Sequence, residues 1–191
     1  MGFVAMLLAM LAVPVTLFAA ETQPKPDDMV NNPPFAHWSA FKPGTAVTQR
    51  ETITLSDGTK LTQDITSKLL EKNKEKVVVE TSYKESGGGV TDQEKTVTAY
   101  PAKVKMSQVD TPDAMLASIT EGTEKVTVKG KEVDAEWVEA VSKEGDEVVT
   151  EKIWTARDIP GGIIKRTITR KKGDKVVSES VLEVLEFSPK G

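Results

Sequence analysis

The chain contains no cysteine, and this absence removes several classes of protein chemistry at once. Without cysteine there is no thiol catalysis, no thiolate metal site and no thiol redox function. Attachment of a lipid to a processed N-terminal cysteine is excluded for the same reason. An exported domain of this size needs no disulfide if its core is large enough, so the absence does not oppose an extracytoplasmic location.

Histidine is almost as scarce, because His37 is the only one. A histidine-based catalytic triad would need His37 to be oriented by a carboxylate and to face a nucleophile. The chain has no Gly-x-Ser-x-Gly turn, and His37 stands beside Trp38 in an expected short helix. We therefore assign His37 to packing or to the surface, and we predict no catalytic residue and no enzyme.

Charge of one sign is not concentrated anywhere in the chain. The formal net charge is −4, and lysine and glutamate are interspersed without a long basic stripe. Phosphate binding needs clustered cations, so a nucleic-acid partner is excluded on electrostatic grounds.

Two other patterns are compared with known ligand sites. Glu132, Asp134 and Glu136 share one strand face, but we interpret them as a solvated row facing Arg157, since calcium sites usually add loop carbonyls and a turn glycine. The three glycines at 87–89 lack the Lys-Ser/Thr and helix that a phosphate loop requires. No metal and no cofactor is predicted.

The one long apolar run lies at the N-terminus, where residues 3–20 carry no charge and end in two alanines. This pattern predicts a signal peptide over residues 1–20, and hence a periplasmic or extracellular protein. No basic residue precedes the run, and the large residues Leu17 and Phe18 stand three positions before the two possible cleavage points. An uncleaved anchor stays open as the alternative, because about 20 apolar residues cross a bilayer. Membrane contact is expected only through this segment.

Composition divides the rest of the chain into two parts. Residues 21–34 are polar and hold four prolines, which predicts a linker. Residues 35–191 are expected to form a single all-β domain. Its first element is a short helix over Phe35–Phe41, because prolines follow Asn32 and aromatic residues then recur at a spacing of three.

From Thr45 onward the period changes to two, and turn signals separate about nine short strands. The fold class is therefore mainly β, a single strongly curved antiparallel sheet in meander order that forms a half-open barrel. The last strand, Lys175–Phe187, is apolar on both sides and is expected in mid-sheet. A helix start at Thr111 predicts a second short helix over Pro112–Ile119, ending at Gly122, and the two helices are expected to cover one face.

Three hairpin registers follow from pairing opposite charges and like faces. They place Trp137 opposite Trp154 around Gly145-Asp146, Arg50 opposite Asp64 around Gly58, and Arg166 opposite Glu179 around Lys172-Gly173. For the third hairpin, a turn at Gly173-Asp174 is disfavoured because it sets Lys172 against Lys175.

A family likeness rests on two stretches of the chain. In Lys152–Lys165, a strand ends in a tryptophan and a Pro-Gly-Gly loop leads into an apolar strand, and the opening Trp38–Thr45 adds to it. These stretches resemble exported bacterial all-β proteins of unassigned role, which are similar to the periplasmic lipoprotein-carrier (LolA-like) superfamily. The resemblance implies a curved antiparallel sheet with helices plugging its concave side. Its motifs are structural, so it assigns no binding residue.

These observations predict a non-enzymatic exported protein that binds an apolar or lipid-like ligand in the concave face of its sheet. The residues expected at the ligand are Trp38, Met115, Trp137, Trp154, Ile159 and Pro160. The alternative is a structural or interaction module of the cell envelope, which holds another protein by a strand edge or loop. An apolar cavity of about 300 Å³ or more beneath the sheet would favour the ligand, and a filled one the module. No oligomeric state follows from the sequence.

Overall fold

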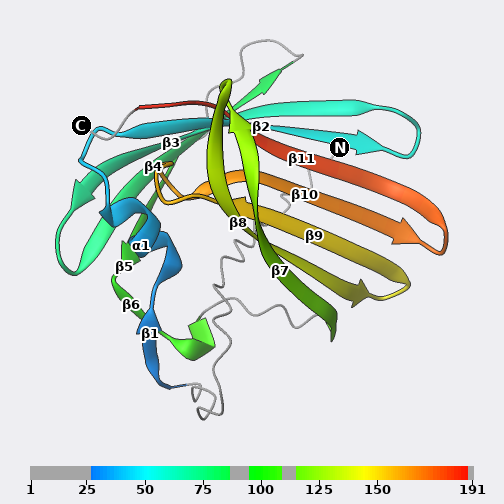
Figure 1. Ribbon diagram of the computed structural model, residues 1–191, viewed down its shortest axis with the longest axis horizontal. Helices are drawn as coiled ribbons and strands as arrows, with labels where there is room; N and C mark the ends of the chain where they lie inside the picture. Colours follow the sequence, from blue (N-terminus) through cyan, green and yellow to red (C-terminus); the bar gives the residue numbers. More distant parts are fainter. Residues whose placement is uncertain (1–26, 87–94, 109–114, 189–191) are drawn as a thin grey trace.

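The computed structural model describes residues 27–86, 95–108 and 115–188. Its main element is a nine-stranded antiparallel sheet in the order β5-β4-β3-β2-β11-β10-β9-β8-β7 (Figure 1). The strands of this sheet are β2 (Ala46–Leu55), β3 (Lys60–Lys72), β4 (Lys76–Ser86), β5 (Lys95–Pro101), β7 (Met115–Val128), β8 (Lys131–Glu144), β9 (Glu147–Thr155), β10 (Ile163–Lys172) and β11 (Lys175–Phe187). The remaining elements are β1 (Met29–Asn31), α1 (Pro33–Ser39), β6 (Lys103–Lys105) and a short 3-10 helix, η1 (Met106–Gln108).

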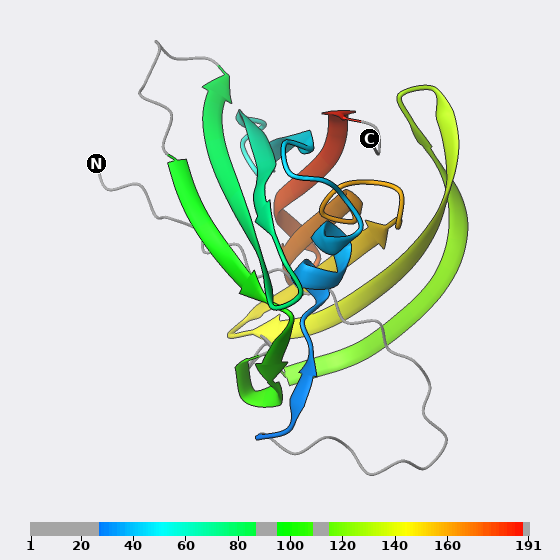
Figure 2. The ribbon, with the colours of Figure 1, turned by 90° about the vertical axis from the view of Figure 1, so that its left-hand side faces the viewer.

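The sheet consists of two meanders, which we call the N-terminal half (β2–β5) and the C-terminal half (β7–β11). The halves join where β2 pairs with β11, so the last strand lies in mid-sheet, as its two apolar sides predict. Strands β5 and β7 end the sheet at opposite edges, and the sheet is not closed into a barrel. Figure 2 shows the sheet curving around α1. The mainly β antiparallel architecture is confirmed.

Helix α1 forms where the prolines and the aromatic spacing predict it. Asn32 precedes the two prolines in an extended conformation, but its side chain caps no helical N–H group. Its Nδ2 instead donates to the carbonyl of Pro101 at 2.8 Å, and its backbone N–H donates to that of Ala102 at 3.0 Å. The start of the helix is thereby tied to the end of β5, and Trp38 and Phe41 are 5% and 1% exposed.

The predicted second helix is wrong over the residues that the structure describes. Residues 115–119 begin β7, and residues 111–114 lie outside the described part of the chain. Gly122 is no helix stop but a strand residue opposite Trp137, whose Cζ2 would lie 2.7 Å from a Cβ at this position. Pairing with β8 over the full length of β7 outweighs the local helix signal at Thr111, since β-branched residues fill the strand.

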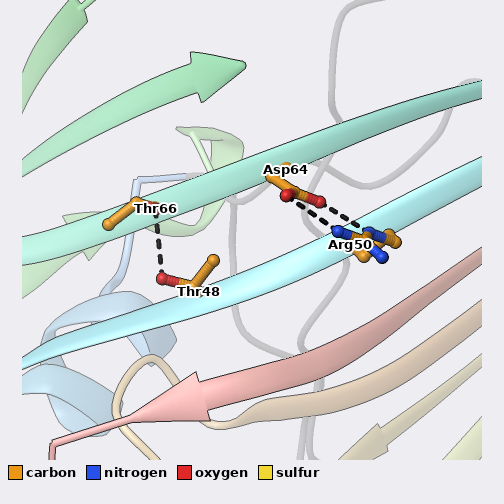
Figure 3. A network of polar contacts seen from close by, with 4 residues as sticks. All are labelled: Thr48, Arg50, Asp64 and Thr66. Carbon is orange, nitrogen blue, oxygen red and sulfur yellow. Dashed lines mark hydrogen bonds and ion pairs between the residues drawn. The ribbon is translucent and has the colours of Figure 1, made fainter. Parts of the chain in front are cut away.

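Two of the three predicted hairpin registers are confirmed. Trp137 lies opposite Trp154, and Arg50 lies opposite Asp64. The Arg50 guanidinium donates to both carboxylate oxygens of Asp64, at 2.7 and 3.0 Å, and a bond of 3.1 Å joins the hydroxyls of Thr48 and Thr66 on the same two strands (Figure 3).

The third register is wrong. The β10–β11 turn is Gly173-Asp174, so Lys172 does lie opposite Lys175, and a bulge after Arg170 puts Arg166 opposite Leu182 instead of Glu179. The prediction counted charges within one hairpin only. Lys172 pairs with Asp146 of the neighbouring hairpin at 2.5 Å, and Arg166 pairs with Glu51 at 3.2 Å.

The main core lies between α1 and the sheet and takes residues from both halves. Its buried members are Trp38, Phe41, Val47, Leu69, Val77, Val79, Val128, Ala135, Trp154, Ala156, Ile159 and Ile164. A second cluster joins Ile65, Ile153, Ile163 and Leu182, with Tyr83 packed against it. Both clusters span several strands, so burial of apolar surface holds the two halves together.

The N-terminal segments fall largely outside the described residues. The predicted signal peptide, residues 1–20, is among them. Within the predicted linker, residues 29–31 form β1 because they pair with Lys103–Lys105 of β6. No helix of the described ranges combines the length and apolar character needed to cross a bilayer.

Candidate functional site

A cavity of about 410 Å³ lies inside the C-terminal half of the sheet. Its lining is Glu124, Lys125, Val126, Thr127, Val128, Trp154, Ile164, Lys165, Glu183 and Val184. Three strands separate β7 from β11 in the sheet order, so both can line one cavity only where the sheet curves back over itself. Figure 1 shows β7 and β8 crossing β9–β11 in this way. The cavity is therefore on the concave side of the C-terminal half.

The cavity is half-open, and polar groups make up more of its accessible lining than apolar ones, but its buried side chains are apolar. Trp154, Ile164 and Val128 are all buried, and the half-buried side chains of Val126 and Val184 complete an apolar floor. The ladder between β9 and β10 is irregular at Ile164, which is skipped between the pairs of Ile163 and Lys165. Such a bulge bends a strand and re-aims a side chain. The irregularity thus falls at a residue of the cavity floor.

The rim of the cavity is charged, and its charges are paired. The ammonium of Lys165 lies 3.2 Å from the carboxylate of Glu183. The indole N–H of Trp154 donates to the carboxylate of Glu124, which also lies 3.9 Å from the ammonium of Lys152. An apolar floor below a polar rim matches a molecule with one apolar and one polar end.

Lysine ammonium groups contact the ring faces of Trp154, in addition to the hydrogen bond that its indole N–H donates. The Lys152 ammonium lies 4.0 Å from the ring centroid of Trp137 and 4.6 Å from that of Trp154, and the Lys165 ammonium lies 5.6 Å from the latter. Cation–π attraction at these distances fixes both rings. Trp137 also packs on Gly122, where a larger residue would collide with it. The tryptophan wall of the cavity is therefore preorganised.

Only one of the six residues predicted at the ligand lines this cavity, namely Trp154. Trp137 packs beside it, half-buried. Trp38, Ile159 and Pro160 are buried and fill space near α1, outside the lining. Met115 is the first residue of β7, at the other end of that strand from the cavity.

Sequence reasoning missed the polar rim, Glu124, Lys165 and Glu183. The signal that was available is the Trp137–Trp154 pair, which places Lys152 and Glu124 near the same rings once β7 is recognised as a strand. Lys165 and Glu183 are direct cross-strand partners in the true register of β10 and β11. The wrong register of β10 and β11 therefore concealed the Lys165–Glu183 pair, whereas the wrong helix, over Pro112–Ile119, does not include Glu124.

The loop before β10 packs on α1 and does not rim the cavity. Gly161 and Gly162 have φ of 76° and 80°, a region that favours glycine. A Cβ at Gly162 would lie 2.2 Å from Nδ1 of His37, and one at Gly161 would lie 3.2 Å from Trp38. Burial lowers the pKa of His37, and the carboxylate of Glu136 acts in the opposite direction. His37 has a packing position, as predicted.

Two of the three carboxylates in the alternating acidic row of β8 lie near cations. Glu132 lies 3.2 Å from Lys125, and Glu136 lies 3.9 Å from Arg157. In the described part of the chain, no three histidine or acidic side chains gather in a way that suits a metal ion.

A buried polar group bridges the seam between the halves. Glu51 of β2 accepts from Arg166 of β10 at 3.2 Å and from Ser180 of β11 at 2.7 Å. Burial raises the pKa of the nearby Glu151, and the positive charges of Arg166 and Arg170 partly offset this increase. Ion pairs of this kind specify one arrangement of strands more than they add net stability.

No protein-family model matches the chain, and no curated protein does. Solved structures of similar fold include an exported protein with a YmcC-like fold from Bacteroides fragilis, with 12% identity, a TM-score of 0.43, and coverage of 76% of this chain and 97% of that one. An outer-membrane lipoprotein-sorting protein domain from Vibrio parahaemolyticus has 7% identity, a TM-score of 0.26 and coverage of 77% and 85%. A LolA superfamily protein from Nitrosomonas europaea has 8% identity, a TM-score of 0.25 and coverage of 85% and 94%.

The descriptions of the last two proteins name lipoprotein sorting and the LolA superfamily, the family that the sequence resembles. At these TM-scores the likeness is distant, so function has to be sought in the chain's own geometry.

Proposed function

We propose that this protein is exported and binds an apolar or lipid-like ligand, without catalysing a reaction on it. The observation that carries the proposal is the cavity of about 410 Å³ with its apolar floor of Trp154, Ile164 and Val184. This volume lies within the range of small-molecule sites, which begins at about 300 Å³.

The two kinds of lining define the class of ligand. The hydrocarbon part lies against Trp154 and Ile164, where water would gain few hydrogen bonds. The polar end lies at Lys165 and Glu183, which are partly exposed, with side chains 34% and 58% accessible. A molecule with a hydrocarbon part and a small polar head satisfies both surfaces.

A single substitution in the floor tests this proposal. Val184→Phe fills part of the cavity, and Val97→Phe is the matched control, because Val97 is 60% exposed on β5, outside the cavity. The full chain, delipidated, is titrated with a fluorescent fatty-acid probe. We expect saturable binding that Val184→Phe weakens at least tenfold and Val97→Phe leaves unchanged. Circular dichroism checks that both variants are folded. Absence of saturable binding, or equal loss in both variants, contradicts the proposal.

Export is tested separately, by mass spectrometry of the protein purified from the cell envelope. We expect the mature chain to begin after Ala19 or Ala20. Recovery of the intact N-terminus favours the uncleaved anchor, and recovery from the cytoplasm overturns export.

An interaction module of the cell envelope is the second candidate. The observation that favours it is β5, which pairs with β4 alone and presents an exposed edge with Val97. Exposed strand edges can accept a strand from another protein. Capture of one envelope protein by the native chain, lost on Val97→Pro, would support this function, and the same experiment with Val184→Phe would show whether the cavity takes part.

A further inference from the structure

The tips of two neighbouring hairpins form one exposed surface. The β2–β3 tip comprises residues 55–61, and the β10–β11 tip comprises residues 171–176; together we call them the paired tips. They are neighbours because β2 pairs with β11, with Ser178 opposite Leu55. Figure 1 shows both hairpins ending on the side of the molecule opposite α1.

The paired tips expose aliphatic side chains where polar residues would be expected. Leu55, Leu61 and Val176 are 38%, 52% and 40% exposed. They account for three of the seven large hydrophobic residues exposed in the described ranges. Scattered exposed aliphatic residues are ordinary, but three gathered on adjacent tips mark an interaction surface.

Lysines surround these aliphatic residues. The paired tips hold four lysines and two aspartates, and because Lys172 pairs with a carboxylate outside them, a local charge of +1 remains in a chain whose net charge is −4. Lys172 pairs with Asp146 of the next hairpin, whereas Lys60, Lys171 and Lys175 are exposed and have no ion pair among the described residues. The surface therefore combines apolar contact with unneutralised positive charge.

We propose that the paired tips dock this protein on a lipid bilayer that carries anionic headgroups. Leu55, Leu61 and Val176 enter the interfacial layer, and the three lysines contact headgroup phosphates, the combination by which peripheral segments bind membranes. The docking is reversible, because three aliphatic side chains bury little area. It does not depend on the cavity, so it stands if the ligand proposal fails.

Fluorescence from single labelled sites tests the docking in the full chain. The native sequence has no cysteine, so Val176→Cys and the control Val97→Cys each take one environment-sensitive dye. With vesicles of phosphatidylcholine and phosphatidylglycerol, we expect a blue shift at position 176 and none at position 97. The control position separates docking by the tips from anchoring by residues 1–20, which would act equally on both labelled proteins.

Substitution of the lysines tests the charge. In the Val176→Cys background, Lys171→Gln and Lys175→Gln are each expected to weaken binding to the anionic vesicles about fivefold, the effect of one lysine near such a surface. Lys131→Gln is the matched control, because Lys131 is exposed at the start of β8, away from the tips and outside the cavity lining. No shift at position 176, an equal shift at position 97, or an equal response to vesicles of phosphatidylcholine alone would overturn the proposal. So would binding unaffected by the lysine substitutions, which would instead favour an apolar protein partner.

Discussion

Two regions inside the curved sheet are enclosed differently, although the same kind of strand sequence surrounds both. Around α1, Trp38 and the following Phe41 are almost fully buried in the main core, which takes residues from both halves; we call this the filled region. In the C-terminal half, the described residues leave a cavity of about 410 Å³ between β7 and β9–β11. Both halves are meanders of β-branched residues. The lining of the cavity contains no residue of α1, so the segment Trp38–Phe41 fills one region of the concave side and the cavity lies beside it.

The largest expected effect contrasts a side chain of the filled region with one of the cavity. Phe41→Ala should cost about 3–5 kcal/mol of unfolding free energy, because it creates a void in a packed core. Val184→Ala should cost about 1 kcal/mol, since the side chain already borders empty space and loses little more than its own transfer energy. Urea denaturation measures both. Equal losses of unfolding free energy would mean that the filled region and the cavity are packed alike.

The next effect concerns the loop that packs on α1. Gly162→Ala should destabilise the protein by about 2–3 kcal/mol, because alanine is strained at positive φ and its Cβ would collide with His37. In the His37→Ala background the collision is relieved, and about 1 kcal/mol should remain for the backbone strain. A double-mutant cycle from thermal unfolding gives the coupling. Additive losses would refute the close contact.

The sequence was sufficient where local pattern and tertiary pairing agree. The alternation of side chains with a period of two predicted the strands, and Gly58 predicted the register of the first hairpin. The two apolar sides of Lys175–Phe187 predicted that this strand lies in the centre of the sheet. It failed where a distant partner decides the structure. Met115–Ile119 joins β8 despite a helix signal before it, and Lys172 finds its counter-charge in another hairpin.

The sequence predicted a ligand site on the concave face of the sheet but not most of the residues that line the cavity. Trp154 and Trp38 were both predicted at the ligand, and both are buried in the main core. Of the two, Trp154 lines the cavity and Trp38 does not, because α1 places Trp38 against Gly161. Curvature brings β7 over β11, and no periodicity in the chain encodes which strands meet across a concave face.

A smaller effect is a dependence of stability on pH, which arises in the filled region at His37 of α1. Burial lowers the pKa of His37 below 6.5, so the unfolded chain binds the proton more tightly than the folded one. The free energy of unfolding that depends on neutral His37 should be fully present above pH 6.5 and should decline as the pH falls below it. The decline should be smaller than the cost of Gly162→Ala. Glu151 acts in the opposite direction at lower pH, because its pKa is raised. The difference between the native protein and His37→Asn, in urea denaturation across this range, isolates the histidine. An unchanged slope in the variant would contradict the assignment.

The smallest effect is within the N-terminal half, where Arg50 of β2 pairs with Asp64 of β3 beside the seam. The hydrogen bonds from Arg50 lower the pKa of Asp64, so their contribution is present above pH 3.8 and is lost as the pH falls below it. In Arg50→Gln the pKa of Asp64, followed by NMR, should rise toward its ordinary value, while unfolding changes little and less still in high salt. A large loss of stability would mean that surface charge contributes substantially to holding β2 on β3. A small loss leaves the stability of the sheet to its strand ladders, to the buried clusters that span both halves, and to the buried bridge of Glu51 and Arg166.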